Sequence, residues 1–377
     1  MKSDLFEDDH EAYRAVVREF VARHVVPNME RWDEQRLIDR ETWLAAGQQG
    51  LLGLSVPEQY GGSGETDYRF RTIVQLEIAR VGASSLQSGF STNDDIVLNY
   101  LLRHANDEQS ARWLPGFVTG ETIGAIAMTE PGAGSDLRGI STTATQVDGG
   151  WRVSGSKTFI TSGILADLVI VFAKTGETFS LFVVEEGMPG FARGRKLDKV
   201  GLRAQDTAEL FFDNVLVPDA NVLGEIGSGL TYLKRSLPLE RLGIAIAGQA
   251  SAEAALGWTI DYVKEREAFG RRLADLQAPA HRLAHLQTAV EVSRAYIDRC
   301  VREWNTGTLS AIDAAKAKAW ATQLQHDVID TGVQLHGGYG YMLEYPIARA
   351  FVDARVQRIY GGANEIMMEI VQKDLLR

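Results

Sequence analysis

The sequence is short of cysteine, of positive charge and of long apolar runs. Cys300 is the only cysteine in 377 residues, so we expect no intramolecular disulfide and no cysteine-based metal cluster, as in a reducing cytosol. Lys and Arg number 39 against 50 Asp and Glu, and the net charge of -11 argues against nonspecific attraction to nucleic acid or to an anionic membrane. No run approaches the roughly 18 apolar residues of a membrane span, and the acidic start of the chain does not resemble a signal peptide. We therefore expect a soluble, cytoplasmic protein without a nucleic-acid or membrane partner.

Several familiar catalytic signatures are also missing. The chain has no dinucleotide fingerprint, no P-loop and no nucleophile elbow. His281 and His285 have the i, i+4 spacing of a metal-binding pair, but no third ligand is near them in the sequence and the glutamate of zinc proteases is absent. We predict that these two histidines lie on a solvated helix face, and we expect no metal site.

What the chain does have is enough apolar material for a large core. Its hydrophobic content of 45% over 377 residues predicts two or three domains, because single cores rarely grow past roughly 250 to 300 residues. Up to about residue 120 the apolar residues recur at helical spacing, as in Tyr13, Val17 and Phe20. This third of the chain is therefore predicted to be helical.

The hydrophobic period changes after residue 121. A turn of Asp148, Gly149 and Gly150 between two short apolar runs predicts a hairpin, and further strands are predicted at 167–173, 179–184 and 209–218. Helical patterns return from residue 227, at 240–267, 277–304, 310–335 and 347–359, and suggest a bundle. We predict a mainly α protein with three domains: an N-terminal helical domain at 1–120, an antiparallel β-barrel-like domain at 121–226 and a C-terminal four-helix bundle at 227–377.

One carboxylate stands inside an apolar helical pattern. Glu240 has leucine at positions 237, 239 and 242 around it, and loss of water on packing would raise its pKa toward the range that a base needs at neutral pH. The alternative is structural. Pro238 fits the first turn of a helix, Ser236 is a good cap, and an acid near a helix start is a favourable partner for the helix dipole. The stretch alone leaves both interpretations open.

Two stretches of the β-region indicate a ligand site. Residues 127–136 place two glycines, Ser135 and several free amides after a short apolar strand. Such a turn can bind an anion such as phosphate, although it is also typical of a plain hairpin connection. Residues 154–163 place Phe159 and Thr161 on the same face of a strand, where an aromatic ring beside a hydroxyl can line a flat cofactor.

Five motifs carry a resemblance to a known family. They lie in order at residues 128–136, 155–163, 266–270, 334–340 and 358–366. Together they resemble the motifs of the flavin-dependent acyl-CoA dehydrogenases, and the resemblance covers nearly the whole chain. It implies that family's fold, which is the helical, β, helical order predicted above, together with FAD as cofactor and an acyl-CoA substrate in fatty acid β-oxidation.

By this resemblance the FAD site is built from two chains. Met128, Thr129, Ser135, Phe159 and Thr161 are implied to bind FAD within one chain, with Phe159 and Thr161 near flavin N5. A neighbouring subunit is implied to add Arg266, Phe269, Gln277, Gln334, Gly337 and Gly338, since a guanidinium suits a pyrophosphate. Ala363 and Glu365 complete the set, and Ala363 replaces a common threonine, which removes one hydroxyl donor. A shared site implies a homo-oligomer, which we expect to be a homotetramer arranged as a pair of dimers.

The resemblance also assigns the catalytic groups. Gly361 occupies the position of the base in many members, and a glycine cannot accept a proton. The branch of long-chain and isovaleryl enzymes places the glutamate on an earlier helix, where Glu240 matches, so Glu240 is the implied base. The Gly361 amide is the implied donor to the thioester carbonyl. The substrate contacts implied are those of Ser135, Arg241, Tyr360 and Gly361.

The implied reaction is α,β-dehydrogenation of an acyl-CoA to a trans-2-enoyl-CoA, with hydride transfer to flavin N5 and electrons then passing to an electron-transferring flavoprotein. Three alternatives remain open at this point. The substrate could be an acyl group on a carrier protein, the enzyme could be an oxygen-using relative, or the chain could be a noncatalytic helical assembly protein that has lost its base. The acyl chain length is not predicted.

Overall fold

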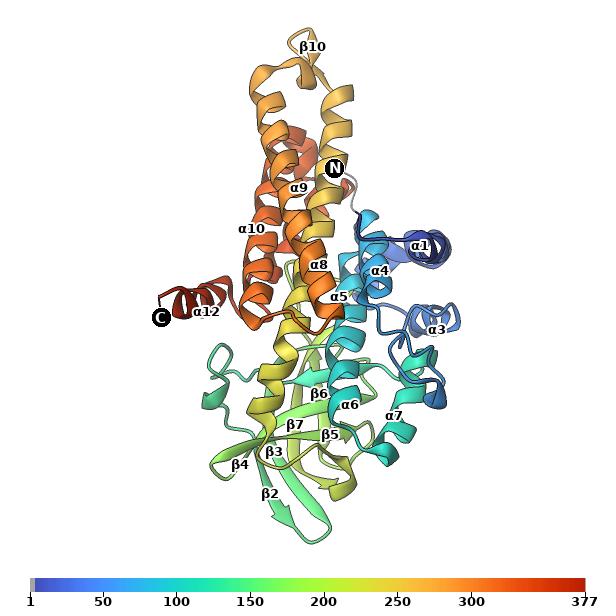
Figure 1. The fold of residues 1–377 in the computed structure, drawn as a ribbon, viewed down its shortest axis with the longest axis vertical. Helices are drawn as coiled ribbons and strands as arrows, with labels where there is room; N and C mark the ends of the chain where they lie inside the picture. The colour runs from blue at the N-terminus through green and yellow to red at the C-terminus, as the bar shows by residue number, and fades with distance from the viewer. Residues whose placement is uncertain (1–3, 377) are drawn as a thin grey trace.

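Helices, a central sheet and further helices follow one another along the chain (Figure 1), as the sequence predicts. The computed structural model describes residues 4–376. The N-terminal part packs around buried apolar side chains such as Phe20, Trp32 and Trp43. Its helices are α1 (Asp8–Phe20), α2 (Met29–Gln35), α3 (Arg40–Gln48), α4 (Tyr68–Arg80), α5 (Ser84–Ser91), α6 (Asn99–His104) and α7 (Asp107–Thr119), with a π-helical segment (Thr92–Leu98) between α5 and α6.

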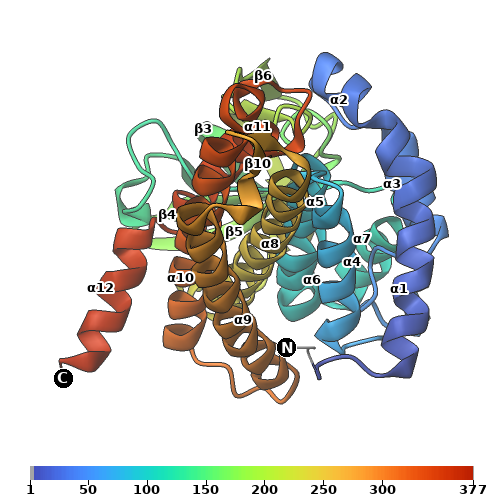
Figure 2. The same cartoon turned by 90° about the horizontal axis from the view of Figure 1, so that it is seen from above.

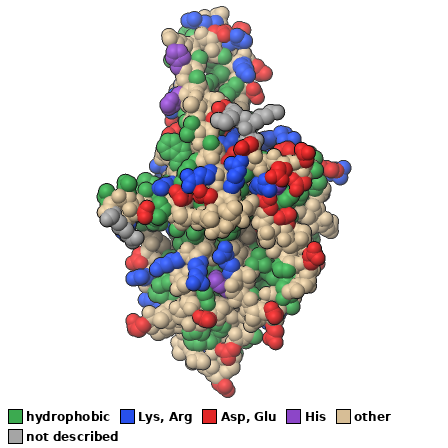
Figure 3. All heavy atoms as spheres, viewed as in Figure 1, with side chains coloured by type: hydrophobic (Ala, Val, Ile, Leu, Met, Phe, Trp, Pro, Cys, Tyr) green, Lys and Arg blue, Asp and Glu red, His purple; other side chains and the backbone are tan. Residues whose placement is uncertain are grey.

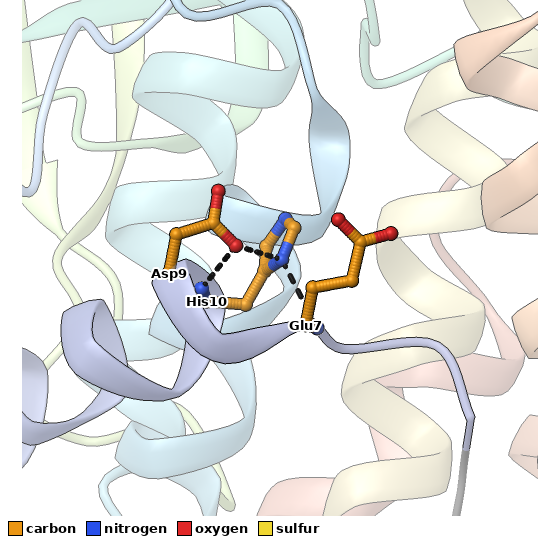
Figure 4. A group of neighbouring side chains, drawn as sticks. All are labelled: Glu7, Asp9 and His10. Atoms are coloured by element: carbon orange, nitrogen blue, oxygen red, sulfur yellow. Dashed lines mark hydrogen bonds and ion pairs between the residues drawn. The ribbon is translucent and has the colours of Figure 1, made fainter.

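Glu7, Asp9 and His10 form the start of α1 (Figure 4). The Glu7 amide donates to Nδ1 of His10 (3.2 Å), and the His10 amide donates to Oδ1 of Asp9 (2.8 Å). Nε2 of His10 lies 3.3 Å from Oδ2 of Asp67, at the start of α4. The side chains of Glu7, Asp9 and His10 are close enough to hold a metal ion, but both ring nitrogens of His10 already have partners. The cluster therefore works as a helix cap that joins α1 to α4.

The central sheet is mostly antiparallel, and its strands run in the order β6-β7-β3-β2-β4-β5-β8. The hairpin predicted at Asp148 and Gly149 is confirmed, since Val147 pairs with Gly150 across the turn. One feature differs from the prediction: β1 pairs with β4 in parallel, and β2 meets β4 in parallel at Thr143. The strands are β1 (Gly124–Ala127), β2 (Thr143–Val147), β3 (Gly150–Thr161), β4 (Leu168–Thr175), β5 (Thr178–Glu185), β6 (Phe191–Lys196), β7 (Thr207–Pro218) and β8 (Val222–Leu223).

The C-terminal helices form an elongated bundle around α8 (Figures 1 and 2). Helix α8 starts beside the sheet and runs to the far end of the molecule, where a short hairpin of β9 and β10 connects it to α9. Helix α12 packs on α10 and stands away from the rest of the chain (Figure 2). The elements are α8 (Gly229–Glu265), β9 (Glu267–Ala268), β10 (Arg271–Arg272), α9 (Gln277–Asn305), α10 (Ala311–His336), α11 (Pro346–Ala354) and α12 (Asn364–Leu375).

The predicted start of the helix that carries Glu240 is wrong. Helix α8 begins at Gly229, and Pro238 lies inside it. A proline there removes the donor to the Lys234 carbonyl, but Lys234 is exposed, so water can take the place of that donor. Apolar side chains on the other face, such as Leu233 and Leu242, are buried and favour continuation of the helix. Glu240 is therefore well inside a helix, and the interpretation of its charge as a helix-end dipole partner is wrong.

Two other boundaries in this part differ from the prediction. The helix predicted at 347–359 ends at Ala354 and continues as a 3₁₀ segment, Arg355–Arg358. Helix α12 was not predicted, and it begins at Asn364, just after the glycine cluster at 361 and 362. His281 and His285 are exposed on α9 as predicted. Charged side chains of both signs are scattered over the face of the molecule seen in Figure 3. Among residues 4–376 no helix has the length and apolar character to cross a bilayer.

Candidate active site

A cavity with about 870 Å³ of empty space lies where the three parts of the chain meet. Helix α8 forms one wall with residues spaced i, i+3, i+4 and i+7, which places them on one helix face. Helix α5 and the π-helical segment form the opposite wall, and the ends of β1 and β3 form a third. The residues contributed by α8 are Glu240, Gly243, Ile244 and Ala247, and Tyr360 and Gly361 close the cavity beside them.

Glu240 is the acidic side chain of this cavity. Its Oε2 is buried and has no hydrogen-bond partner among the described residues. Burial raises the pKa of Glu240 to about 7, and the positive charges of Arg241 and Lys318 oppose that rise. A carboxyl with this pKa is close to half ionised at neutral pH, which suits a group that must take up and release a proton.

Gly361 lies directly beside this carboxylate. Its φ of +62° is in the left-handed region that favours glycine. A Cβ at this position would lie 2.3 Å from Cδ1 of Ile244 and 3.5 Å from Oε1 of Glu240. Cδ1 of Ile244 therefore occupies the space that a Cβ at position 361 would need, and the Glu240 carboxylate lies at ordinary contact distance beside it. The Gly361 amide makes no hydrogen bond within the described part of the chain, so its N–H remains available to a ligand.

The strand wall is fixed by a buried ion pair. Nζ of Lys157 donates to Oε1 of Glu130 (2.9 Å) and to the carbonyl of Met128 (2.9 Å). The Thr158 amide donates to the carbonyl of Thr129 (2.9 Å). Since Lys157 and Glu130 are both buried, β3 holds the segment after β1 in place, and Met128 and Thr129 line the cavity from there.

Phe159 and Thr161 both line the cavity, but a β-bulge, and not the regular alternation of a strand, places them there. The pairing of β3 with β7 is irregular between Lys157 and Ile160, and Phe159 has a φ of +60°. This bulge turns the Phe159 side chain outward, where 67% of it is exposed, and brings Ile160 to the cavity as well. An exposed aromatic ring at the rim of a cavity is a surface ready for a flat ligand.

Ser135 lies outside this cavity. It is exposed on the loop that follows Met128 and Thr129. In the same loop a Cβ at Gly132 would meet nothing within 4 Å, and one at Gly134 would make only an ordinary contact with Cγ2 of Thr129 (3.9 Å). Glu130 anchors the base of the loop by accepting the amides of Ser141 (2.6 Å) and Thr142 (2.9 Å). The loop is therefore an open turn with free backbone, held at its foot and adjacent to the cavity.

Most of the other residues predicted to bind a cofactor lie at the opposite end of the bundle. Arg266, Gly337 and Gly338 line a separate surface pocket there. Phe269, on the hairpin of β9 and β10, is 92% exposed with a φ of +55°, and Gln277 and Gln334 are at the near ends of α9 and α10. At 1.5 Å per helical residue, the length of α8 separates Glu240 from Arg266 by roughly 38 Å. A single chain therefore does not bring the two predicted groups together.

Three more predicted residues lie close to the cavity without lining it. Arg241 is buried, and its Nη2 lies 4.0 Å from the position of a Gly362 Cβ. Ala363 is the N-cap of α12, and Glu365 is exposed in the first turn of that helix. Arg241 thus stands behind the glycine segment, while Glu365 is turned to solvent.

The sequence analysis missed the wall that faces α8. This wall carries hydroxyl and amide side chains at helical spacing, and its members are Ser84, Gln87, Ser88, Ser91, Thr92 and Ile96. Hydroxyl-bearing residues at i, i+4 and i+7 of one helical segment were the available signal. Also missed were Gly243, Ile244 and Ala247, which carry no chemical motif.

Comparisons with known proteins cover the whole chain. Family models described as the N-terminal, middle and C-terminal domains of acyl-CoA dehydrogenase match residues 7–121, 125–215 and 227–376. The mitochondrial long-chain specific acyl-CoA dehydrogenase of Sus scrofa is 46% identical, over 99% of this chain and 87% of its own length. The mitochondrial isovaleryl-CoA dehydrogenase of Solanum tuberosum is 36% identical, over 99% of this chain and 92% of its own length.

Solved structures match equally fully. The crystal structure of acyl-CoA dehydrogenase from Geobacillus kaustophilus has a TM-score of 0.97 at 43% identity, covering 99% of this chain and 100% of that one. An acyl-CoA dehydrogenase from Bacillus anthracis, solved in complex with FAD, has a TM-score of 0.95 at 30% identity, covering 100% of this chain and 68% of that one. A structure named for the electron-transferring flavoprotein of Acidaminococcus fermentans has a TM-score of 0.95 at 32% identity, with full coverage of both chains.

Proposed function

The chain belongs to the acyl-CoA dehydrogenase family, and from that membership we propose that it converts an acyl-CoA to a trans-2-enoyl-CoA with Glu240 as the base. Members of this family are FAD-dependent oxidoreductases that act on the CH–CH group of an acyl-CoA. One observation carries the proposal: a buried carboxylate with a free oxygen lies in the cavity beside Gly361.

Glu240 would remove the proton from the α-carbon of the thioester. That proton is a very weak acid, so the base must be matched in pKa and the developing enolate must be stabilised. Burial brings the pKa of Glu240 to about 7, and Tyr360, Ile244 and Ala247 line the cavity around the carboxylate, which limits its access to water. The ionised form of this group is then a stronger base than an exposed glutamate.

Gly361 would hold the thioester carbonyl. Its free amide lies beside the Glu240 carboxylate, so a substrate carbonyl bound to this N–H would present its α-carbon to the base. A donor placed in advance at the enolate oxygen favours the charge that develops during proton removal. Glycine suits this position because its left-handed φ directs the amide without adding a side chain to the crowded space next to Ile244.

The strand wall and the open loop fit FAD. The exposed ring of Phe159, with Met128, Thr129 and Thr161 nearby, can hold the flat isoalloxazine, and the free amides around Ser135 suit a pyrophosphate. Arg241 is buried behind the glycine segment and would position it without touching the cofactor. When bound, FAD would supply the two-electron oxidation by accepting the β-hydrogen as hydride at N5.

The remote group of predicted residues implies a second copy of the chain. Arg266, Phe269 and Gln277 cannot reach the cavity of their own chain, because α8 separates them from Glu240. Phe269 is nearly fully exposed, as a residue that contacts another subunit would be in a single chain. We therefore propose a homotetramer in which these residues, with Gln334, Gly337 and Gly338, complete the FAD site of a neighbour, and an electron-transferring flavoprotein as acceptor.

The test is the visible spectrum. The FAD-loaded protein should be yellow, and anaerobic mixing with straight-chain and branched acyl-CoA thioesters should bleach its flavin absorbance, with a dependence on length that identifies the substrate. The same acyl groups on a carrier protein, and runs in air with and without an artificial acceptor, distinguish the carrier-protein and oxygen-using alternatives. A protein that cannot be loaded with FAD, or a flavin that no thioester bleaches, would contradict the proposal.

The rate of flavin bleaching is expected to fall below pH 7. Only ionised Glu240 can accept the proton, and burial raises its pKa to about 7, so acidification through pH 7 removes the active form. The rate should drop about tenfold per pH unit on the acid side and level off above the pKa. Rapid mixing at acyl-CoA concentrations well below saturation measures this profile, because kcat/KM reports the pKa values of the free enzyme. An acid limb near 4.5, the ordinary value for glutamate, would show that the base is not this buried group.

A further inference from the structure

The segment that carries Gly361 has little support from its own backbone. Gly361 and Gly362 have φ values of +62° and +90°, and the segment connects the 3₁₀ turn at Arg355–Arg358 to α12. Two consecutive glycines in left-handed conformations leave the chain many alternatives in the unfolded and loosened states. Something outside the segment must therefore fix the direction of the Gly361 amide.

Lys318 provides this fixation from α10. Its side chain is fully buried, and Nζ donates to the carbonyl of Gly362 (2.8 Å) and to Oδ1 of Asn364 (2.9 Å). One helical turn further on, Nδ2 of Asn364 donates to Oγ1 of Thr322 (3.0 Å). Lys318 thus holds the Gly362 carbonyl, and Lys318 and Thr322 together hold the side chain of Asn364.

Small side chains on α10 leave space for a buried lysine. Its neighbours on the helix are small, with Ala315, Ala317, Ala319 and Ala321 all buried, so α10 packs close to α8 and to the glycine segment. A long stem can lie in such a space while its ammonium reaches backbone oxygens. A buried ammonium is costly without strong partners, and the two acceptors of Lys318 belong to the glycine segment and the start of α12.

We propose that Lys318 is a positioning residue for the reaction: by holding the Gly362 carbonyl it directs the Gly361 amide toward the thioester oxygen. The inference rests on the proposed function, because it assigns a purpose to the Gly361 donor. The peptide held by Lys318 is one residue from Gly361, so a shift of the carbonyl carries the donor with it. A misplacement of about 1 Å at a reacting group can cost about 100-fold in rate.

Lys318 also contributes charge at the base. The groups that face Glu240 are Arg241 from α8, Lys318 from α10, the phenol of Tyr100 from α6 and the phenol of Tyr360. Burial lowers the pKa of Lys318 to about 8, so its ammonium remains the main form at pH 7. Removing this cation leaves Arg241 to favour ionised Glu240, so the pKa of Glu240 rises and the acid limb of the pH profile should move to higher pH.

The experiment compares Lys318→Gln and Lys318→Met in the FAD-loaded protein with wild type. The first measurement is the rate of flavin bleaching by the acyl-CoA that wild type oxidises fastest. The second is the affinity for acetoacetyl-CoA and longer 3-oxoacyl-CoA homologues, which ionise readily to an enolate. The affinity for free CoA is the reference for the second measurement. We expect kcat to fall about 10- to 100-fold for Lys318→Met, with a matching loss of 3-oxoacyl-CoA affinity, unchanged CoA affinity and an acid limb at higher pH. Lys318→Gln should recover part of the affinity, because its amide can still donate, but should keep the shifted pH profile.

Lys316→Gln is the matched control. Lys316 is on the same helix but is about half exposed and lies 3.3 Å from Asp313, so its loss should leave all three measurements unchanged. Asn364→Ala retains Lys318 and loosens the segment, and should weaken 3-oxoacyl-CoA binding even if the Lys318 variants do not fold. Wild-type rates and affinities in a folded Lys318→Met protein, or in Asn364→Ala where the Lys318 variants do not fold, would overturn the inference. Failure of wild type itself to bleach or to bind thioesters would overturn the proposed function instead.

Discussion

Glu240→Gln is expected to slow flavin bleaching by acyl-CoA about 100- to 10,000-fold, the range for loss of a general base. Glutamine keeps the shape of the side chain and cannot accept the proton. Because Glu240 lines the cavity from α8 and its Oε2 has no hydrogen-bond partner among the described residues, FAD content and melting temperature should stay close to wild type. Anaerobic rapid mixing gives the rate, and the remaining activity should lose its dependence on pH near 7.

Glu253→Gln is the matched control for this variant. Glu253 is on the same helix, and burial raises its pKa as well, but it bonds to Gln249 and pairs with Arg294 outside the cavity. Its substitution should leave the bleaching rate near wild type. Full activity in Glu240→Gln would contradict the assignment of the base. Glu365 on α12 would then be the next residue to substitute.

Gly361→Ala is expected to have the second largest effect. The added Cβ would lie 2.3 Å from Cδ1 of Ile244, and a residue other than glycine at this φ costs about 1–2 kcal/mol. The segment must shift, and the Gly361 amide shifts with it. Loss of one donor to a developing oxyanion costs about 100- to 1,000-fold in rate, so we expect a fall of that size with a melting temperature a few degrees lower, measured by rapid mixing and thermal unfolding.

Two further variants distinguish the effect of the contact with Ile244 from that of the backbone strain at position 361. Gly257→Ala adds the same methyl group on α8 where nothing lies within 4 Å, and it should leave activity unchanged, since alanine favours helices. Ile244→Val removes the Cδ1 atom that collides, so combining it with Gly361→Ala should restore part of the rate and leave the backbone strain. A Gly361→Ala protein with wild-type rate and stability would show that neither the contact nor the amide direction matters.

The fold was predictable to the extent that it depends on local periodicity. Helical and strand-like spacing gave the order of the three regions, and Asp148 and Gly149 gave the β2–β3 hairpin. The parallel pairing of β1 with β4 was not predictable, because the two strands are distant in sequence and no local signal sets their register. At Pro238 local propensity pointed to a helix start, and burial of the surrounding side chains overrode it.

The candidate site was predictable where a motif exists. Glu240 and Gly361 came from the family resemblance, and the structure places them side by side in one cavity; their roles remain predictions. The hydroxyl-bearing wall of α5 has no motif, and only packing shows that it faces α8. Lys318 was missed for another reason: a lysine on a helix is ordinarily exposed. Its sequence neighbours give no sign that its ammonium bonds to Gly362 and Asn364.

Because Glu240 lies beside Gly361 in the cavity, the residues that are tolerated at these two positions depend on each other. By the family resemblance, the base can come from helix α8 or from position 361. Here Cδ1 of Ile244 already stands where a Cβ at 361 would lie, and Oε1 of Glu240 is 3.5 Å from that point. A larger residue at 361 should be harmful while Glu240 is present, and loss of Glu240 harmful while 361 is glycine. This is reciprocal sign epistasis: each single change lowers fitness, and only a joint change at 240, 244 and 361 could move the base.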